Sequence, residues 1–392
     1  MKIVAAGGGS GGHVTPVLAV INELTKHDPK LKAYFVTDKN FGAQAAQIMS
    51  KASVPVKTKQ IFAGKFRRYH KMSILRQILD IQTVLLNLRD LFYTAIGFVQ
   101  SLILLVRVKP DVVFTKGGFV CMPVGLAANL LHIPVVVHDS DAHPGFTNRV
   151  IAKHAASIAT GSPVENYNYP KGRTHYVGIP VSSSFRPVSD AQKQKLKAAL
   201  GLHNTKKPLV VVTGGGLGAR NINRSMTTIA LQLLPSAAVV HITGDLGYKE
   251  VVLQAPEDID YIIKPFISTG MAPVFGAADV VVTRAGATTM QELAAMTKPV
   301  IIIPNPLLTG GHQLKNAAVY QKDKAAIVID EDKLVVNPLM LLKAIRMLID
   351  NPDKAKILGQ RLHSFAKPDA AVDTAALIAE AAAIHKHQEV AK

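Results

Sequence analysis

Short apolar runs alternate with longer amphipathic segments along nearly the whole chain. The runs are rich in Val and Ile, while many of the segments between them carry apolar residues at helical spacing, such as Val14, Leu18, Ile21 and Leu24. Nearly continuous apolar strands that alternate with helices are typical of a parallel sheet covered on both faces. The predicted strands are residues 2–6, 33–37, 111–115, 133–138, 156–160, 175–178, 209–213, 238–243, 261–264, 279–283, 300–304 and 326–329.

These strands form two series, one in each half of the chain, which predicts two doubly wound α/β domains with ligand sites at the carboxyl ends of their strands. A length of 392 residues favours this division, because one hydrophobic core seldom serves so long a chain. Ser and Pro cluster between residues 178 and 187, which indicates the break. We expect an amino-terminal domain over 1–180 and a carboxy-terminal domain over 181–369, with a last helix, 370–392, that could pack back onto the first domain.

One stretch departs from the alternation. Residues 91–106 carry no charged side chain, and a basic and aromatic segment, 65–71, lies upstream of them. The run is shorter than the ~20 apolar residues of a membrane-spanning helix, so we predict a helix buried against the sheet. Contact with a membrane interface is the alternative, because aromatic rings beside Lys and Arg suit an anionic lipid surface. A solvated loop would explain segment 65–71 equally well.

Glycine-rich turns follow three of the predicted strands. Residues 6–16 read Ala-Gly-Gly-Gly-Ser-Gly-Gly-His-Val-Thr-Pro, residues 116–119 read Lys-Gly-Gly-Phe, and a similar turn covers 213–220. Glycine lets the backbone approach an anion closely, and the first N–H groups of the next helix point at it. We therefore predict phosphate or diphosphate binding at these turns, with the helix after the first turn beginning at Pro16.

His13 lies inside the first of these turns. A neutral imidazole beside a sugar hydroxyl can remove its proton as a general base. A histidine that only caps the helix is the structural alternative. A dinucleotide site is a weaker interpretation: Asp38 closes the second strand as such a site would need, but a GxGxxG-like turn is not specific by itself.

The carboxy-terminal half carries a more specific pattern. Residues 283–292 place a turn after a strand and put Glu292 in the first turns of the next helix. A carboxylate there can accept hydrogen bonds from both hydroxyls of a ribose, while the N–H groups around Ala287–Thr289 face a phosphate. Gln313, after the following strand, could contact a sugar hydroxyl.

Composition and charge narrow the function classes. The formal net charge is +18, yet no zinc-ligand spacing or other nucleic-acid signature accompanies it, so we predict no nucleic-acid partner. The single cysteine, Cys121, excludes an intrachain disulfide and fits a reducing cytoplasm. The apolar segment at the amino terminus is too short for a signal peptide, so secretion is not expected.

Taken together, these motifs resemble the MurG family, the UDP-N-acetylglucosamine transferases of peptidoglycan synthesis. The resemblance covers nearly the whole chain and implies the GT-B fold. It also implies an inverting transfer of N-acetylglucosamine from UDP-GlcNAc to undecaprenyl-diphosphate-linked muramyl-pentapeptide, in cell wall synthesis, by a peripheral enzyme on the cytoplasmic face of the cell membrane. The segments that carry it are 8–13, 109–113, 117–119, 133–138, 214–220, 278–281, 286–292 and 313–317.

The resemblance also implies roles for single residues. His13 would be the catalytic base, Glu292 the ribose ligand, Gln313 a contact of the donor sugar and Ile267 the neighbour of the uracil. The acceptor side would be lined by Ser10, Gly11, Gly12, Gly117, Gly118 and Asp141. The donor diphosphate would lie at Gly216, Gly286, Ala287, Thr288, Thr289, Met290 and Gln291.

Three alternatives stay open at this point. Asp139 and Asp141 flank Ser140, where the family usually has Glu-Gln-Asn after its histidine, and they imitate the Asp-x-Asp metal motif of another transferase fold. Helix amino termini can stabilise a leaving diphosphate without an ion, so we predict no metal and no cofactor beyond the UDP-sugar substrate. A UDP-N-acetylglucosamine 2-epimerase-like enzyme, or a non-catalytic subunit that binds UDP-sugar or docks on a membrane, would share the same architecture.

Overall fold

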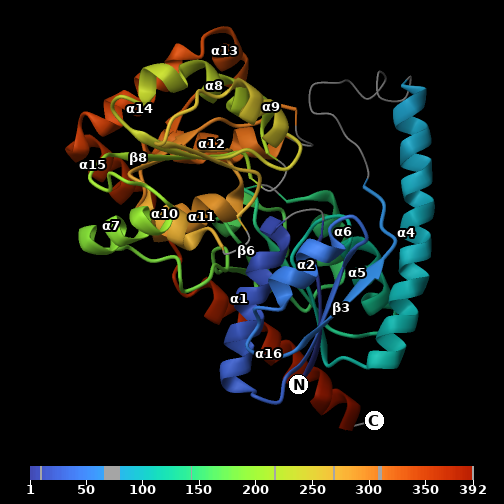
Figure 1. Ribbon diagram of the computed structural model, residues 1–392. Helices are drawn as coiled ribbons and strands as arrows, with labels where there is room; N and C mark the ends of the chain where they lie inside the picture. The colour runs from blue at the N-terminus through green and yellow to red at the C-terminus, as the bar shows by residue number, and fades with distance from the viewer. Residues whose placement is uncertain are drawn as a thin grey trace. The chain divides into compact units, whose positions relative to one another are not determined.

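A computed structural model describes residues 1–8, 11–65, 80–142, 144–215, 218–267, 270–307 and 311–390. It contains two compact units, Met1–Ser182 with Lys367–Lys392, and Ser183–Ala366 (Figure 1). The sequence-based division falls at 180/181, and the last helix is part of the first unit.

The first unit, as far as it is described, is built on a seven-stranded parallel sheet in the order β3-β2-β1-β4-β5-β6-β7. The chain builds outward from β1 in one direction and from β4 in the other, and a ligand crevice is expected where this order reverses. The strands are β1 Lys2–Ala6, β2 Lys32–Asp38, β3 Val56–Ile61, β4 Val112–Thr115, β5 Val135–Asp139, β6 Ser157–Thr160 and β7 Thr174–Tyr176.

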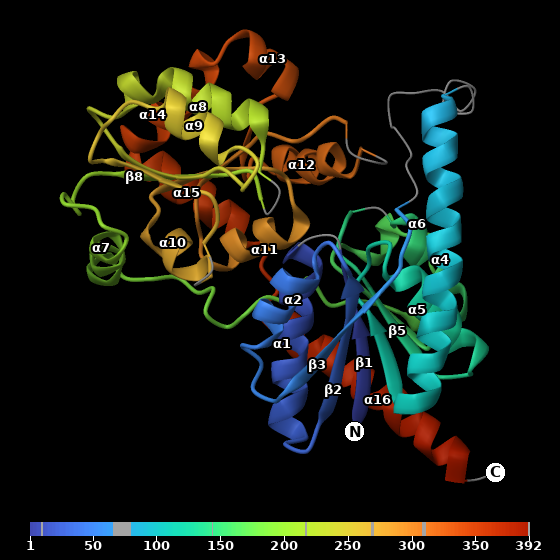
Figure 2. The same cartoon turned by 45° about the vertical axis from the view of Figure 1, so that its right-hand side comes forward.

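Helices cover both faces of this sheet, as Figure 2 shows. Successive residues of a strand point to opposite faces, so Ile3 packs with α1, α2 and α16, while Val4 packs with α4, α5 and the end of α6. Helix α16 lies against α1. The helices are α1 Gly11–His27, α2 Gly42–Met49, α4 Ile81–Val108, α5 Cys121–Leu130, α6 Phe146–Ile151 and α16 Ala370–Val390, with 3-10 helices η1 Ala152–His154, η2 Val164–Asn166 and η3 Lys171–Arg173.

Two local features of this unit differ from the sequence prediction. Helix α1 begins at Gly11 rather than at Pro16, because the glycine turn ends earlier and Pro16 is accommodated inside the helix. His13 therefore lies in the first turn of α1. Strand β3 was not predicted, because Lys57, Lys59 and Gln60 interrupt its apolar side chains, as an edge strand allows, so that no apolar run forms.

Helix α4 corrects the prediction of a buried helix over 91–106. It runs from residue 81 to 108 and packs against α5 through its small and polar face, whereas its apolar face is exposed. The inward residues are Thr83, Asp90, Thr94, Gly97, Ser101 and Leu105. The outward stripe, at helical spacing on the opposite side, is Ile81, Leu85, Leu88, Phe92, Val99, Ile103 and Val106.

Close backbone approach explains the inward stripe of α4. A Cβ added at Gly97 would lie 1.9 Å from the carbonyl oxygen of Phe62, so only glycine fits there. The Gln100 side chain accepts a hydrogen bond from the Phe62 N–H at 2.8 Å, and the Thr94 hydroxyl accepts one from the Gly64 N–H at 3.3 Å. Small side chains and hydrogen bonds thus fasten the helix to its unit, together with Leu105, which joins the hydrophobic core.

The second unit is built, in its described residues, on a six-stranded parallel sheet in the order β10-β9-β8-β11-β12-β13. One face packs on α8, α13 and α14, and the other on α10, α11 and α12. The strands are β8 Leu209–Thr213, β9 Ala238–Ile242, β10 Tyr261–Lys264, β11 Val280–Thr283, β12 Val300–Ile302 and β13 Ile327–Val328. The helices are α7 Asp190–Ala199, α8 Arg220–Leu233, α9 Tyr248–Gln254, α10 Ala272–Ala277, α11 Ala287–Ala295, α12 His312–Lys322, α13 Glu331–Val336, α14 Leu339–Ile349 and α15 Pro352–His363.

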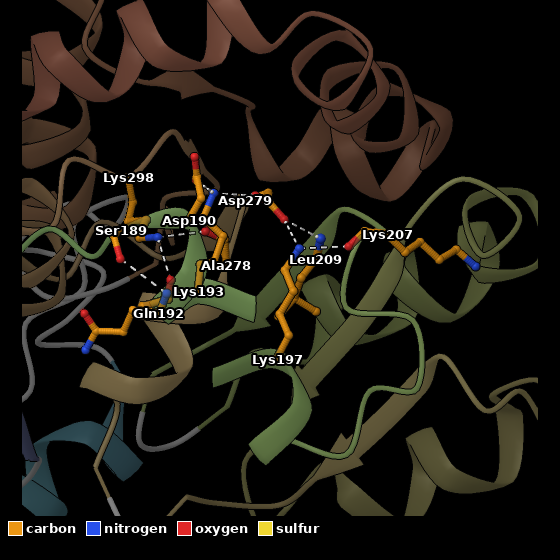
Figure 3. Close-up of polar contacts among 11 residues, drawn as sticks. Ser189, Asp190, Gln192, Lys193, Lys197, Lys207, Leu209, Ala278, Asp279 and Lys298 are labelled. Carbon is orange, nitrogen blue, oxygen red and sulfur yellow. Dashed lines mark hydrogen bonds and ion pairs between the residues drawn. The ribbon is translucent and has the colours of Figure 1, made fainter. Parts of the chain in front are cut away.

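An ionic cluster at the amino-terminal edge of this sheet holds α7 in place (Figure 3). The Asp279 carboxylate accepts hydrogen bonds from Lys193 Nζ at 2.9 Å, from Lys197 Nζ at 2.6 Å and from the Leu209 N–H at 2.9 Å. These donors keep the pKa of Asp279 below its usual value despite burial. The buried Lys298 donates to the carbonyl oxygens of Gly276 and Ala278 nearby. The cluster lies at the edge opposite to the carboxyl ends of the strands, so its role is structural.

Candidate functional site

The first candidate site lies at the carboxyl ends of β1, β4 and β5, which are neighbours in the sheet. The glycine turn after β1 leads into α1, and residues 116–120 lead from β4 into α5. A Cβ added at Gly118 would lie 3.4 Å from His13 Cδ2, and one added at Gly117 would lie 3.7 Å from His13 Cε1. The imidazole of His13 therefore lies over both glycines.

The conformation of these glycines explains why no larger residue stands there. Gly117 and Gly118 have φ angles of 95° and 87°, which L-residues with a Cβ rarely adopt. The Cβ of any substituent at Gly118 would also lie 2.9 Å from the carbonyl oxygen of Gly8. The two turns, far apart in sequence, are thus held together at the carboxyl edge of the sheet, with no side chain on the glycines between their backbones.

Buried charged and polar side chains stand behind this surface. Lys116 is 1% exposed and donates a hydrogen bond to the Ser140 hydroxyl. Burial lowers the pKa of Lys116 to about 8, although Asp141 and Asp139 oppose the shift. Burial and the neighbouring Asp141 raise the pKa of Asp139 to about 7, and its carboxylate accepts a hydrogen bond from Tyr169 Oη at 2.8 Å.

His138, the last of the buried group, is held as a neutral imidazole. Burial lowers its pKa well below the usual value. Its Nε2 lies 2.8 Å from the carbonyl oxygen of Gly178, which can only accept, so Nε2 carries the proton. His138 thereby connects the end of β5 with Gly178, which lies near the end of the segment Met1–Ser182 of this unit.

The predicted acceptor residues are brought together only in part. His13, Gly117 and Gly118 are in contact, and Gly11 and Gly12 begin α1 beside them. Asp141 follows β5 at the same edge of the sheet and is half-buried, while Ser10 lies outside the described residues. Two side chains that the sequence analysis did not select are also at this edge.

These two are Lys116 and Asn148. The amide Nδ2 of Asn148 donates a hydrogen bond to the His138 carbonyl oxygen at 3.4 Å. A Cβ added at Gly117 would lie 3.3 Å from the same nitrogen. A lysine directly after an apolar strand and before two glycines was the available sequence signal for Lys116. Asn148 stands in an ordinary helix, and no local pattern marks it.

The second candidate site lies at the carboxyl ends of β8, β11 and β12, which are also adjacent in their sheet. Helix α11 begins after Gly286, whose lack of a side chain leaves its amino terminus without a side-chain cap. The first N–H groups of a helix have no partner within the helix and attract anions. Ala287, Thr288 and Thr289 therefore present their N–H groups at this edge, as the sequence predicts for a diphosphate site.

Glu292 lies on the second turn of α11 and is 8% exposed. Burial raises the pKa of its carboxyl group to about 8, and no hydrogen bond or charge among the described residues opposes that shift. A buried carboxyl group that lacks a donor is costly in a folded protein unless a ligand completes it. Two vicinal hydroxyl groups would supply suitable donors.

The other predicted donor residues differ in where the structure places them. Met290 is fully buried in the core, and its N–H donates to the Gly286 carbonyl oxygen at 2.9 Å, so it cannot contact a diphosphate. The amide oxygen of Gln313 accepts a hydrogen bond from the Asn305 N–H at 2.9 Å, so only its Nε2 can reach a sugar. Gln291 is 5% exposed, Ile267 is half-buried, and Gly216 lies outside the described residues.

A buried ion pair supports the same edge from below. Arg284, directly after β11, donates to Glu331 Oε1 at 2.6 Å and to the Ile303 carbonyl oxygen at 3.0 Å. Asn316 of α12 donates to the Ala285 carbonyl oxygen at 3.1 Å. These bonds fix the turn that precedes α11, and sequence reasoning had assigned no role to Arg284.

No group of three or more His, Cys, Asp or Glu side chains that could hold a metal ion occurs in the described part of the chain. The buried carboxylate of Asp139 already accepts a hydrogen bond from Tyr169 Oη, and this arrangement does not suit a metal ligand. The independence from metal that we predict from the sequence stays a prediction.

Comparison with known proteins places this arrangement among two-domain glycosyltransferases. Residues 3–160 match the glycosyltransferase family 28 N-terminal domain, and residues 209–373 match the family 28 C-terminal domain. The UDP-N-acetylglucosamine–N-acetylmuramyl-(pentapeptide) pyrophosphoryl-undecaprenol N-acetylglucosamine transferase of Halalkalibacterium halodurans is 34% identical over 97% of this chain and 100% of its own length. The chain therefore belongs to glycosyltransferase family 28 and, within it, to the family of N-acetylglucosamine transferases that this relative represents.

Solved structures agree on the fold. The MurG of Acinetobacter baumannii superposes with a TM-score of 0.65 at 23% identity, covering 97% of this chain and 99% of the other. The UDP-GlcNAc 2-epimerase of Neisseria meningitidis reaches a TM-score of 0.61 at 14% identity, covering 97% of this chain and 100% of the other. Likeness at these identities concerns the fold alone, and it confirms the predicted pair of doubly wound GT-B domains.

Proposed function

We propose that this chain transfers N-acetylglucosamine from UDP-N-acetylglucosamine to a polyprenyl-diphosphate-linked muramyl-pentapeptide, the step of peptidoglycan synthesis for which its relatives are named. The observation that carries the proposal is the 34% identity to such a transferase along the whole length of both chains. The two glycine-rich strand ends and the buried Glu292 provide the chemistry that the reaction needs.

The second unit would hold the nucleotide. Glu292 accepts hydrogen bonds from the two ribose hydroxyls, and these donors complete a carboxyl group that burial leaves without partners. The amino terminus of α11 faces the diphosphate, where its N–H groups stabilise the charge that develops as UDP departs. Ile267 would line the uracil.

The first unit would hold the acceptor and its base. His13 takes the proton of the attacking acceptor hydroxyl, whose oxygen forms a bond to the anomeric carbon. The bond from that carbon to the UDP oxygen breaks, and UDP leaves with its electron pair, so the configuration at the sugar inverts. The backbone at Gly117 and Gly118, which carries no side chain, suits the acceptor diphosphate.

A lipid-linked acceptor requires access to a membrane, and we assign this access to α4. In the described residues, this helix is long and apolar enough to cross a membrane, with 22% of its most apolar window buried. The inward stripe of α4 packs on α5, so lipid cannot surround the helix. We infer that the outward stripe lies in the membrane interface. The helix is about 42 Å long at 1.5 Å per residue. Residues 66–71 of the basic segment, and with them Arg67, Arg68 and Lys71, lie outside the described residues, so their part in binding an anionic surface at the cytoplasmic face stays a prediction.

The proposal is tested by transfer of labelled N-acetylglucosamine from UDP-GlcNAc to polyprenyl-diphosphate-linked muramyl-pentapeptide in detergent or vesicles. We expect a labelled lipid-linked disaccharide and stoichiometric UDP. Parallel reactions with other UDP-hexosamines define the donor sugar. UDP-GlcNAc incubated without acceptor should stay unchanged; a new UDP-sugar would indicate an epimerase instead. UDP binding without any transfer would leave a binding subunit and refute the proposal.

A further inference from the structure

Lys116 is a buried lysine that the proposed reaction does not use. Its side chain is among the largest that the fold buries completely, yet it lies at the carboxyl end of β4, directly before Gly117. A buried ammonium group is costly unless it is paired and hydrogen-bonded. Its position beside a candidate ligand site, and not in a core contact between helices, calls for a partner of opposite charge.

The hydrogen-bond partner of Lys116 and the two carboxylates that act on it lie at the end of the neighbouring strand, β5, or directly after it. The ammonium group donates to the Ser140 hydroxyl, and the carboxylates on either side, Asp139 and Asp141, act on it electrostatically. Lys116 therefore connects the turn that carries the two glycines under His13 with the turn that carries Asp141. The two turns come from adjacent strands of one sheet.

The two carboxylates are not equivalent. Asp139 is 2% exposed, and Tyr169 Oη and the Gly145 N–H donate to it at 2.8 and 3.3 Å. Asp141 is half-buried, and its main-chain carbonyl oxygen accepts a hydrogen bond from Tyr167 Oη at 2.6 Å, which fixes the backbone there. Of the pair, Asp141 is the carboxylate that a bound acceptor would meet.

A carboxylate at the edge of a diphosphate site would repel its ligand. Resting on the proposed function, in which this edge binds an acceptor diphosphate, we propose that Lys116 is a positioning residue that compensates the charge of Asp141. The buried ammonium neutralises the carboxylate and fixes the Ser140 turn, so that Asp141 can accept hydrogen bonds from donor groups of the acceptor without excluding its phosphates. Lys116 touches neither substrate in this arrangement.

The test is a charge-balanced double substitution. Lys116→Met removes the ammonium group and retains most of the side-chain volume. We expect kcat/KM for the lipid-linked acceptor to fall by about 10- to 100-fold, with the loss in acceptor KM, because a charged hydrogen-bonded group is removed. Asp141→Asn alone should cost at most about fivefold. Lys116→Met combined with Asp141→Asn should restore kcat/KM to within about fivefold of the wild type, since both charges leave together.

Donor affinity and a second lysine serve as controls. The affinity for UDP, measured by calorimetry, should stay unchanged in all these variants, because the nucleotide site belongs to the other unit. Lys298→Met removes another buried lysine, which is 6% exposed in the second unit, and should leave the acceptor KM at the wild-type value. If Lys298→Met raised the acceptor KM as much as Lys116→Met does, the effect of both substitutions would be a general loss of stability, and the proposal would be overturned.

The remaining outcomes are equally decisive. A Lys116→Met enzyme as active as the wild type, or a loss that Asp141→Asn does not relieve, overturns the charge compensation. Should Lys116→Met alone fail to fold, the double variant decides, because it removes the ammonium group and the Asp141 carboxylate together and leaves only Asp139, which keeps its hydrogen bonds from Tyr169 Oη and the Gly145 N–H. Acceptor kinetics near the wild type then support the proposal, and a folded, inactive protein contradicts it. Failure of the wild type to use the lipid-linked acceptor would instead refute the proposed function itself.

Discussion

The carboxyl edges of the two sheets handle charge in opposite ways. In the first unit, the ammonium group of Lys116 lies among Ser140 and the carboxylates of Asp139 and Asp141, so opposite charges meet inside the protein. In the second unit, Glu292 is buried with burial as the sole cause of its raised pKa. The charged groups of the first edge have partners within the protein, whereas we propose that a ligand supplies the missing donors at the second.

This difference matches the two ligands of the proposed reaction. Ribose hydroxyls are donors, and a carboxylate without donors is a selective receptor for them, since a nucleotide lacking those hydroxyls leaves it uncompensated. A diphosphate carries negative charge of its own, so acidic side chains beside it need a cation. Substitutions in the first unit should therefore change acceptor kinetics, and those in the second should change nucleotide binding.

The largest effect is expected at the base of the first unit. His13→Ala removes the group that accepts the hydroxyl proton, and we expect kcat to fall by about 10²- to 10⁴-fold. UDP affinity should stay at the wild-type value when measured by calorimetry. A variant that binds UDP normally and keeps full transfer would assign His13 to capping α1 instead.

The matching substitution in the second unit is Glu292→Gln. The amide keeps the shape but offers one acceptor oxygen, so UDP should bind about 10- to 100-fold more weakly. The acceptor KM should be nearly unchanged when the donor is saturating. Comparison of UDP with 2′-deoxy-UDP isolates the hydroxyl contact: the wild type should prefer UDP strongly, and the variant should lose that preference. Equal preference in both proteins would remove Glu292 from the ribose.

A smaller effect is expected from the exposed face of α4. Phe92→Glu combined with Val99→Glu should weaken sedimentation with anionic vesicles about tenfold, because both side chains lie on the outward stripe. UDP binding should not change. Leu253→Glu, at a leucine 86% exposed in the second unit, is the matched control and should sediment like the wild type. Equal losses in both proteins would point to a non-specific effect of added charge.

The smallest effect concerns stability. The pKa of Glu292 is raised from 4.5 to about 8, so the folded chain keeps a proton that the unfolded chain has lost between these pH values. Stability contributed by this group therefore falls as pH rises from about 4.5 to about 8. Glu292→Gln should remove that penalty and raise Tm relative to the wild type by about 2 °C or more at pH 8, with a smaller gain at pH 5. A difference in Tm that is the same at both pH values would contradict the assignment.

Strand positions, fold class and family were accessible from the sequence because they depend on local patterns. Apolar runs such as Leu209–Thr213 became strands with the predicted bounds. Edge strand β3 was not predicted, since its Lys and Gln residues interrupt the inward residues and no apolar run forms. Pro16 misled the prediction of the start of α1, because a glycine turn can enter a helix before the proline.

The site was less accessible because its residues meet only through sheet order. Glycine turns and Glu292 could be selected from spacing, and their roles stay predictions. The role of Lys116 depends on Ser140 and Asp141, which follow the neighbouring strand. Nothing in the spacing of these residues along the chain indicates that they meet. Met290 was included in the predicted diphosphate site because it lies within the motif 287–291. Only the burial of its side chain, seen in the structure, excludes it from that site.

The construction of α4 has a practical consequence. Because the inward face of α4 attaches the helix, its outward residues Leu85, Leu88 and Phe92 contribute little to the hydrophobic core. Their replacement by hydrophilic residues should leave the folded unit intact, giving a detergent-free preparation whose chemistry can be studied with a water-soluble acceptor. Adhesion to lipid and assembly of the fold are thereby separate properties of one helix.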